Sequence, residues 1–359
     1  MNETLKCGEG TRALLTAHYK AYPKMQIEDI FKYLFQSAFG CEHLVSDKSS
    51  ALAYIEKEYE MQSETNPPRT EVLDGEYSRV YLSWLNSGLK SETLATLFCL
   101  SAKKEPNGTA MLEQKLESAR ALIAEGALPF DIVDFDEKLA LWRSLGYPAV
   151  RHSDVFRAEY RPVYRVVSNR YTDFLSLFSK IDALLDKQGS AVIAIEGGSA
   201  SGKTTLSGIL EKVYGCNVFH IDDFFLRPEQ RTPERLAEIG GNVDRERFFS
   251  EVVTPLKNNE TVRFRRFDCA SQTLGEEISV APKELTVVEG VYSTHPKLEK
   301  YFDLSLFLDI DSEYQKQRIL KRNAPQFAKR FFNEWIPLEN AYFSATDIKK
   351  RSDLIFKVN

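Results

Sequence analysis

The stretch that decides the fold of this chain is EGGSASGKTT, residues 196–205. Counted from Gly197, it has the spacing Gly-x-x-x-x-Gly-Lys-Thr of a phosphate loop, also called a Walker A motif. It follows the apolar run AVIAIE, and TTLSGILEKVYG after it has helical spacing. Glycines let backbone N–H groups approach phosphate oxygens, and the start of a helix attracts anions. The stretch therefore predicts a strand, a phosphate loop and a helix in succession.

The loop predicts nucleotide binding, with ATP and Mg²⁺ as the expected cofactors. Lys203 is expected to contact the β- and γ-phosphates, and the Thr204 hydroxyl is expected to ligate Mg²⁺. A glycine- and serine-rich turn with an exposed lysine is the alternative. The GxGxxG pattern of dinucleotide-binding proteins is not present in this loop. The expected ATP-binding residues are Gly197, Gly198, Ser199, Ala200, Ser201, Gly202, Lys203, Thr204 and Thr205.

The sequence around the loop alternates short apolar runs with helical stretches. Runs of about five apolar, β-rich residues separated by crossover segments predict an α/β fold, with a parallel sheet and helices on both faces. Ligands of such sheets bind beyond the carboxyl ends of the strands. The five predicted strands are residues 191–196, 217–221, 285–289, 304–310 and 353–358.

Carboxylates follow two of these predicted strands. Asp222 and Asp223 come after the second strand, in HIDDFF, and Glu289 ends the third, in LTVVEG. Beside a phosphate loop, an aspartate at this position can accept a proton from an attacking hydroxyl or hold the metal. A helix N-cap pair is the alternative for the aspartates, and a surface glutamate is the alternative for Glu289. We expect an aspartate of this pair, Asp222 or Asp223, to be catalytic, and we expect Thr204, Glu289 and this aspartate to serve the metal.

A basic segment follows the fourth predicted strand. RILKRNAPQFAKR, residues 318–330, contains no acidic residue, and Arg318 and Arg322 are four residues apart, on one helical face. Arginines that close over the γ-phosphate stabilise charge during phosphoryl transfer. We therefore expect Arg318 and Arg322 to act with Lys203 in catalysis. A solvated basic helix face is the alternative.

The first half of the chain has a different pattern. Its segments, such as MQIEDIFKYLFQSAFG, have mostly helical spacing, and SETNPPRTEVLDGEYS (63–78) is expected to be a loop because of its turn residues. Gly189-Ser190 marks the change of pattern. We expect a mainly α-helical domain at 1–185 and a P-loop kinase domain at 186–359.

Composition and charge limit which partners and which cellular location are expected. The 359 residues carry a formal net charge of −5, which gives no global attraction to nucleic acid or to an anionic membrane, and neither partner is expected. No apolar run is long enough for a membrane span, and the first residues lack the apolar core of a signal peptide. The five cysteines are scattered and form no CxxC pair, which argues against disulfides and zinc. A cytoplasmic location is expected, and the sequence leaves the oligomeric state open.

Residues from about 190 to the end resemble the uridine kinase, phosphoribulokinase and pantothenate kinase branch of P-loop kinases. The resemblance rests on EGGSASGKTT, HIDDFF, GGNVDRERFF, VRFRRFDC, VVEGVYS, FDLSLFLDIDSEYQKQRILKRN and SDLIFKV, in that order. It implies a five-stranded parallel sheet, Mg·ATP and phosphoryl transfer to a hydroxyl of a small molecule. It also implies that Asp222 is the general base.

The resemblance also suggests substrate-binding residues. Uridine kinases carry an FDHP segment whose aspartate binds the ribose, and NVDRER places Asp244 there. They also carry a YDF…H segment that reads the base. The corresponding FDCASQ has Phe267 in place of the tyrosine and Gln272 in place of the histidine. Asp244, Phe267, Gln272 and the additional Asp223 are thus the expected acceptor-binding residues.

The first half resembles an N-terminal extension of large uridine-kinase-like proteins of bacteria. Its segment GYPAVRHSDVFRAEYRPVYRVV interleaves basic and aromatic residues. That mixture fits an anionic ligand or nucleic acid, and it also fits a basic linker docked on the kinase domain.

The function predicted from the sequence is an ATP-dependent, uridine kinase-like enzyme that phosphorylates a hydroxyl, most plausibly of a nucleoside. The alternatives are a kinase of pantothenate or a sugar, and a nucleotide-binding switch that acts through the helical domain.

Overall fold

The chain divides into two compact units. The structure, a computed structural model, describes residues 7–41, 47–62 and 68–358. Contacts within the chain separate Met1–Asp182 (unit 1) from Ala183–Asn359 (unit 2). The division falls inside helix α9 (Leu175–Gln188), close to the boundary expected after residue 185. That each unit folds alone stays a prediction.

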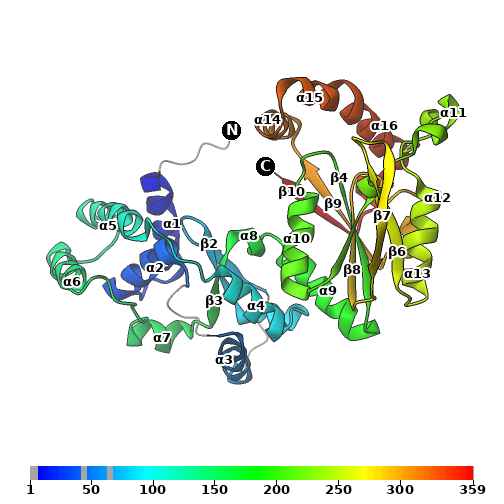
Figure 1. Ribbon diagram of the computed structural model, residues 1–359. Helices are drawn as coiled ribbons and strands as arrows, with labels where there is room; N and C mark the ends of the chain where they lie inside the picture. The colour runs from blue at the N-terminus through cyan, green and yellow to red at the C-terminus, as the bar shows by residue number, and fades with distance from the viewer. Residues whose placement is uncertain (1–6, 42–46, 63–67, 359) are drawn as a thin grey trace. The chain divides into compact units, whose positions relative to one another are not determined.

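Unit 2 is built around a five-stranded parallel sheet (Figure 1). The prediction of a five-stranded parallel α/β fold is confirmed, and the predicted strands agree with the observed ones to within one residue at either end. They are easy to locate because central strands are buried on both faces; every residue of β8 is buried. The strands are β4 (Ala191–Gly197), β5 (Asn217–His220), β8 (Leu285–Glu289), β9 (Leu304–Ile310) and β10 (Leu354–Val358).

The strand order places the phosphate loop at the middle of the sheet. The order is β10-β9-β4-β8-β5. After β4 the chain continues to β5 at one edge of the sheet, and after β8 it crosses β4 to reach β9 on the opposite side of β4. The loops after β4 and β8 consequently diverge at the carboxyl edge. In open α/β sheets, a divergence of this kind opens the crevice in which ligands bind.

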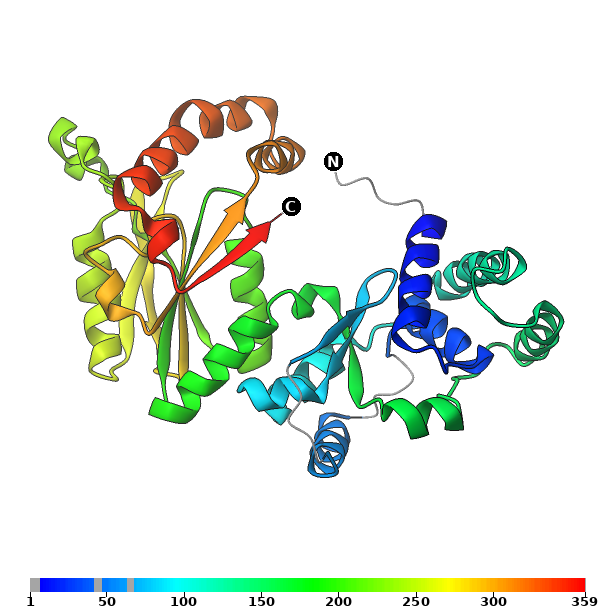
Figure 2. The same ribbon diagram turned by 180° about the vertical axis from the view of Figure 1, so that it is seen from behind.

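Helices and an antiparallel hairpin cover the sheet of unit 2. Helix α10 (Lys203–Tyr214) lies on one face of the sheet (Figures 1 and 2). An apolar cluster that includes Phe219, Phe248 and Phe264 packs on the other face. The hairpin β6–β7 within this layer was not predicted from the sequence. Strand β6 carries buried residues between exposed ones, and its Phe264 and Phe267 face inward, whereas the residues of β7 are exposed or half-buried.

The remaining helices of unit 2 are short. They are α11 (Pro233–Ala237), α12 (Arg245–Phe248), α13 (Thr254–Lys257), α14 (Ser312–Arg322), α15 (Pro325–Arg330), α16 (Ile336–Thr346) and α17 (Ile348–Arg351). The strands of the hairpin are β6 (Val262–Asp268) and β7 (Thr273–Val280).

Unit 1 is mainly helical, as expected, but it also contains a three-stranded antiparallel sheet with the order β1-β2-β3. The helices are α1 (Cys7–Ala21), α2 (Ile27–Phe39), α3 (Lys48–Glu60), α4 (Ser91–Ser101), α5 (Gly108–Ala124), α6 (Ile132–Ser144), α7 (Asp154–Tyr160), α8 (Asn169–Thr172) and the first part of α9. The strands are β1 (Thr70–Val72), β2 (Tyr77–Tyr81) and β3 (Tyr164–Ser168).

The sheet of unit 1 corrects one expectation. The stretch 63–78 was expected to be a loop; residues 63–67 lie outside the described residues, but the rest contains β1 and the start of β2. Asp74-Gly75, with Gly75 at φ 125°, forms the turn between the two strands. An Asp-Gly pair between β-rich residues is a hairpin signal. The prolines and charges before it obscured that signal.

The basic and aromatic segment at 146–167 is part of unit 1. It forms α7 and most of β3, which pairs with the central strand β2. It is therefore a folded part of unit 1 rather than a linker. In the described part of the chain, no helix combines the length and the apolar character needed to cross a bilayer. The expected cytoplasmic location stays a prediction.

Candidate functional site

The phosphate loop depends on glycines at two positions. Gly197, the last residue of β4, has φ 145°, and a Cβ there would lie 2.7 Å from the carbonyl oxygen of Leu308 on β9. Gly202, with φ 103°, immediately precedes the first residue of α10. Side chains rarely tolerate these backbone angles. The loop therefore follows β4 closely and delivers Lys203 to the start of the helix.

Lys203 folds back over the loop. Its ammonium group donates to the carbonyl oxygens of Gly197 at 2.8 Å and Gly198 at 3.0 Å, and only 9% of the residue is exposed. These carbonyls fix the position of the charge. Since the first turn of α10 begins at the same residue, the positive end of the helix dipole lies beside the ammonium group.

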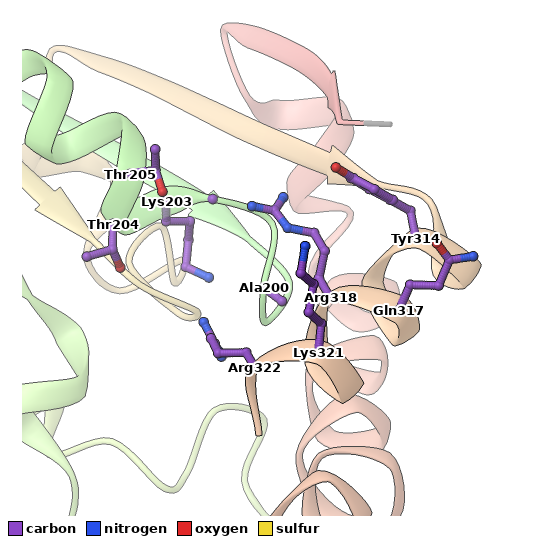
Figure 3. Close-up of a pocket in the computed structure, with 10 residues that line it drawn as sticks. Ala200, Lys203, Thr204, Thr205, Tyr314, Gln317, Arg318, Lys321 and Arg322 are labelled. Atoms are coloured by element: carbon purple, nitrogen blue, oxygen red, sulfur yellow. The ribbon is translucent and has the colours of Figure 1, made fainter. Parts of the chain in front are cut away.

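A cavity of about 650 Å³ opens between the loop and helix α14 (Figure 3). Lys203, Thr204 and Thr205 line it on one side, and Arg318, Lys321 and Arg322 project into it from α14. The described lining residues include no carboxylate. Of the predicted ATP-binding residues, the structure thus brings Ala200, Gly202, Lys203, Thr204 and Thr205 to one cationic cavity, together with Arg318 and Arg322. Gly197, Gly198, Ser199 and Ser201 are not in the lining of this cavity.

The outer side of the loop is tied to unit 2 by two other helices. Glu339 of α16 accepts hydrogen bonds from the backbone N–H of Ser199, at 2.9 Å, and from its hydroxyl. Gln315 of α14 donates to the Ser199 carbonyl oxygen at 2.8 Å. Sequence reasoning missed both residues, because they lie more than a hundred residues from the loop. Ser199 is therefore held by protein groups, whereas Thr204 and Thr205 face the cavity.

Two of the three predicted metal-binding residues, Thr204 and Glu289, are in contact. Thr204 Oγ1 donates to Glu289 Oε1 at 3.0 Å, and His220 Nδ1 lies 2.6 Å from the same oxygen. Burial raises the pKa of Glu289, but the bond from His220 and the charge of Lys203 outweigh it, so that the pKa is lowered overall. Glu289 is thus a carboxylate at neutral pH, and it raises the pKa of His220 in turn.

This donor set fits Mg²⁺. Among the described residues, no group of three or more His, Cys, Asp or Glu side chains could hold a metal ion. Mg²⁺ does not require such a cage, because it keeps several waters and binds one or two protein oxygens together with phosphates. The Thr204 hydroxyl and the ionised Glu289 are oxygen ligands of the kind it prefers.

Asp222 lies in a short 3₁₀ turn, Ile221–Phe224, directly after β5. Its side chain is accessible to solvent, yet the surrounding protein raises its pKa by desolvation. Lys203 lowers the pKa, and Glu289 raises it again. Asp222 therefore shares one electrostatic environment with the phosphate loop and Glu289, at the carboxyl edge of the sheet.

Asp223 points to a different set of partners. Its carboxylate lies 3.2 Å from Nε of Arg266 on β6, and Arg247 donates to its backbone oxygen at 2.8 Å. Desolvation raises the pKa of Asp223, and Arg266 opposes this effect. The two neighbouring aspartates thus have different neighbours, with Asp222 near Lys203 and Asp223 against the arginines.

The other predicted acceptor-binding residues are spread over this side of the sheet. Asp244, only 3% exposed, accepts from the backbone N–H of Arg247 at 3.0 Å and from Gln230 Nε2 at 2.8 Å. It is the N-cap of α12. Phe267 is buried, with the Arg231 guanidinium 5.7 Å from its ring.

Gln272 sits in the turn between β6 and β7. Its φ is 60°, and its amide Nε2 donates to the Cys269 carbonyl oxygen at 2.6 Å, while the structure shows no partner for Oε1. Cys269 in the same turn was missed by sequence reasoning. Burial raises the pKa of its thiol, and Asp222 raises it further, which places the turn near Asp222.

Arginines of the segment 227–235 have protein partners. Arg235 pairs with Glu246 and donates to the Gly241 and Val243 carbonyl oxygens. Arg227 bonds to Gln230, within the same short turn. These contacts hold the segment that precedes α12. Sequence reasoning could not separate such arginines from ligand-binding ones, because the partner atoms are backbone carbonyls.

Glu196, the residue before the last one of β4, is a further missed residue. It is fully buried and accepts bonds from the Gly197 N–H, Thr294 and Tyr342. Burial raises its pKa to about 7. Glu196 therefore joins the start of the phosphate loop to the segment after β8 and to α16. Its place one residue before the motif was the only signal in the sequence.

Comparison with known proteins gives a partial match. No protein-family model matches the chain. Uridine kinases of Staphylococcus aureus, strains JH9 and Newman, are each 26% identical to it over 183 residues, which is 47% of this chain and 87% of the relative. Over about half of its length, the chain is thus similar to uridine kinases, which supports a relationship to P-loop kinases of this kind.

Two solved structures complete the comparison. A possible uridine kinase from Bacillus stearothermophilus is 22% identical, with a TM-score of 0.38, and the alignment covers 50% of this chain and 99% of that one. A shikimate kinase from Bacteroides thetaiotaomicron is 12% identical, with a TM-score of 0.26 and coverages of 47% and 86%.

Proposed function

We propose that unit 2 transfers the γ-phosphoryl group of ATP to a hydroxyl of a small molecule, and that the acceptor is a nucleoside. One observation carries the proposal. Lys203, Thr204 and the arginines of α14 line a single cavity, and Asp222 lies in the same electrostatic environment at the strand ends. The similarity to uridine kinases supports the nucleoside.

The loop and α14 would hold the triphosphate from opposite sides. Backbone N–H groups at the start of α10 and the Lys203 ammonium group supply positive charge from below. Arg318 and Arg322 supply it from above; neither has an ion-pair partner among the residues described. A Cβ built on Gly202 would lie only 3.9 Å from the Arg318 guanidinium, so the cavity is narrow there. Charge that develops during transfer would then meet cationic groups on both sides.

Thr204 and Glu289 would hold Mg²⁺, which neutralises phosphate charge when bound. His220 fixes the orientation of the Glu289 carboxylate through its bond to Oε1. A histidine that positions a carboxylate in this way leaves the second oxygen of Glu289 for the metal or its water. The hydroxyl of Thr204 then gives up its bond to Glu289 and offers a lone pair instead.

Asp222 would accept the proton of the attacking hydroxyl. The new bond joins the acceptor oxygen to the γ-phosphorus, the bond from that phosphorus to the bridging oxygen breaks, and ADP leaves. The proton moves to the Asp222 carboxylate, which releases it to solvent because its side chain is accessible. Desolvation raises the pKa of Asp222, which makes its carboxylate a stronger base for this step.

Acceptor selection would fall to residues on the hairpin side. Asp244 is buried and oriented by Gln230, Phe267 offers an apolar face, and Gln272 retains an oxygen that can accept a bond from a base edge. Asp223 completes the set. A hydroxyl compound with a carboxylate, such as pantothenate, is the second acceptor class, because the exposed Arg266 guanidinium beside Asp223 would attract it.

The test is ADP release from Mg·ATP with a panel of nucleosides, pantothenate and sugars, with a control that contains no acceptor. We expect ADP release that depends on a nucleoside. Asp222→Asn should lower kcat about 10³-fold without weakening ATP binding. Asp223→Asn is the matched control and should mainly change KM for the acceptor. Turnover that is indifferent to every acceptor would contradict the proposal and favour a nucleotide-driven switch.

A further inference from the structure

Unit 1 contains a cationic pocket that the proposed function does not use. It has two neighbouring compartments of about 380 Å³ and 290 Å³, which share Lys32 of α2, His152 and Pro162 as lining residues. Ligand pockets for small organic molecules commonly have volumes of this order. The residues come from α2 and from the segment around α7, more than a hundred positions apart in the chain.

Positive charge dominates the first compartment. Arg151, Arg157 and Arg161 line it together with Lys32, and its described lining residues include no carboxylate. Arg157 forms an exposed ion pair with Asp154. Arg151 and Arg161 have no ion-pair partner among the described residues, although both lie in a segment with several acidic neighbours.

Lys32 is held inside the compartment by a backbone contact. Its ammonium group donates to the Val150 carbonyl oxygen at 3.0 Å, which is a neutral partner. Burial lowers the pKa of Lys32 to about 8, and Arg79 and Arg151 add to the decrease. A bound anion would relieve this repulsion. The ammonium group and the two unpaired arginines thus form a site with a deficit of negative charge.

The floor of the compartments is rigid. His152 Nδ1 lies 2.8 Å from Asp29 Oδ1, and its Nε2 lies 2.7 Å from the Tyr164 hydroxyl. The imidazole stacks on Phe156, with ring centroids 4.3 Å apart and an angle of 3° between the planes. Burial lowers the pKa of His152 to about 4, so the ring is neutral at pH 7. Its orientation is fixed before any ligand arrives.

A buried guanidinium lies below this floor. Arg79 of β2 is fully buried; Nε donates to Gln36 at 2.9 Å, and Nη1 lies 3.3 Å from Glu71. Nη2 has no hydrogen-bond partner in the structure. Arg79 therefore adds to the positive potential felt by Lys32 and His152.

The second compartment has a different chemistry. Tyr54, Phe98 and Tyr164 line it with aromatic surface, and Gln36 and Ser50 add polar groups. The carboxylate of Glu58, also on this lining, pairs with Arg165. Such a surface suits the organic part of a ligand whose anionic group occupies the first compartment.

We propose that unit 1 binds a small phosphorylated organic molecule, with its phosphate among Lys32, Arg151 and Arg161 and its organic part against Tyr54 and Phe98. Arginines recognise phosphate oxygens through paired N–H groups, and aromatic side chains stack on flat rings. A nucleoside monophosphate combines the two chemistries. The pocket is then a ligand site separate from the phosphate loop of unit 2.

The test is calorimetric titration of the full chain carrying Lys203→Ala, which weakens phosphate binding at the loop of unit 2. The probes are UMP, uridine and inorganic phosphate. We expect UMP to bind to the pocket of unit 1 and inorganic phosphate to bind there more weakly. Uridine, which the acceptor site of unit 2 is proposed to bind, should show no binding that substitutions at Arg151 and Arg161 change. Arg151→Glu with Arg161→Glu should weaken UMP binding at least about tenfold. Arg170→Glu with Lys180→Glu, two exposed cations of unit 1 outside the pocket, is the matched control and should change it less than about twofold.

A second variant tests the organic compartment. Tyr54→Ala, at a side chain that is 64% exposed, should weaken UMP binding several-fold and leave inorganic phosphate unaffected. Circular dichroism of each variant confirms that the fold is retained. Equal losses in the two double variants, or no binding of UMP, would overturn the proposal. A single-stranded RNA that binds tighter than UMP, and loses binding with Arg151→Glu and Arg161→Glu, would also overturn it and assign the pocket to nucleic acid.

Discussion

Units 1 and 2 each present a cationic cavity, but they build it in different ways. In unit 2 the charge comes from a contiguous motif and the first turn of α10, joined by arginines of one helix. In unit 1 it comes from side chains of α2 and of the segment around α7, over a buried Arg79. A phosphate site built from the backbone requires glycines at fixed spacing, and this spacing can be recognised in the sequence. A site built from side chains of distant segments shows in the sequence only as scattered basic residues.

The largest effect that we expect separates the two cavities. Lys203→Ala should lower ATP-dependent turnover about 10³-fold or more, because the ammonium group is the fixed charge nearest to the transferred phosphoryl group. UMP binding at unit 1 should be unchanged. Steady-state kinetics and calorimetry on the same preparation measure both. A variant that keeps full turnover would break the phosphate-loop assignment.

Substitution of Arg318, one of the two arginines of α14 that project into the cavity, should give the next largest effect. Arg318→Ala should lower kcat about 10²-fold, since an arginine over the γ-phosphate acts mainly on the transition state. Lys329→Ala, at an exposed cation of α15 outside the cavity lining, is the control and should be nearly neutral. If both substitutions have the same small effect, the arginine belongs to a solvated basic face.

Separating the units should have a smaller effect on chemistry. A fragment of residues 183–359 contains the whole sheet, loop and α14 cavity, so we expect it to melt cooperatively and to keep kcat within about threefold of the full chain. Thermal unfolding and ADP release measure the two properties. Insolubility, or loss of a cooperative transition, would mean that the units share one core.

The smallest expected effect is an opposite response to pH. In unit 1, His18 and Arg79 hold the pKa of Glu71 down to about 2 against burial, and burial lowers that of His152 to about 4. Both groups bind fewer protons in the folded than in the unfolded state. His152 therefore lowers stability as pH falls below about 6.5, and Glu71 does so only as pH falls below about 4.5. In unit 2 burial raises the pKa of Glu196 to about 7. That group binds more protons when folded, so stability is lost as pH rises through about 7.

Tryptophan fluorescence can separate these responses. Trp335 belongs to unit 2, and Trp84 and Trp142 belong to unit 1. In the full chain carrying Trp335→Phe, the remaining tryptophans report on unit 1. The midpoint temperature of its thermal unfolding should fall by about 3 °C when the pH is lowered from 7.5 to 5.5. The midpoint temperature of the fragment 183–359 should not fall over the same pH range. In this fragment, burial lowers the pKa of His295 to about 4, and its effect on stability opposes that of Glu196. Glu196→Gln should remove the rise in stability at low pH. Parallel shifts in both units would contradict the assignment.

Prediction from the sequence succeeded where the chemistry is local. The strands of unit 2 were located to within a residue because each is a short apolar run bounded by turn residues. The hairpin β6–β7 was missed because VRFRRFD carries three arginines on its solvent side, and only alternate residues face the core. Arg266 and Cys269 near the aspartates were missed for the same reason.

The sequence alone determined that unit 2 has a five-stranded parallel sheet with a phosphate loop at the end of its first strand, since glycine spacing and strand runs act over a few residues. Only the tertiary structure decided which charges meet. It put Glu339 on Ser199, Arg318 beside Gly202, and Lys32 beside Arg151. Electrostatic and hydrogen-bond partners are set by distances in space, and chain folding joins positions that no local pattern relates.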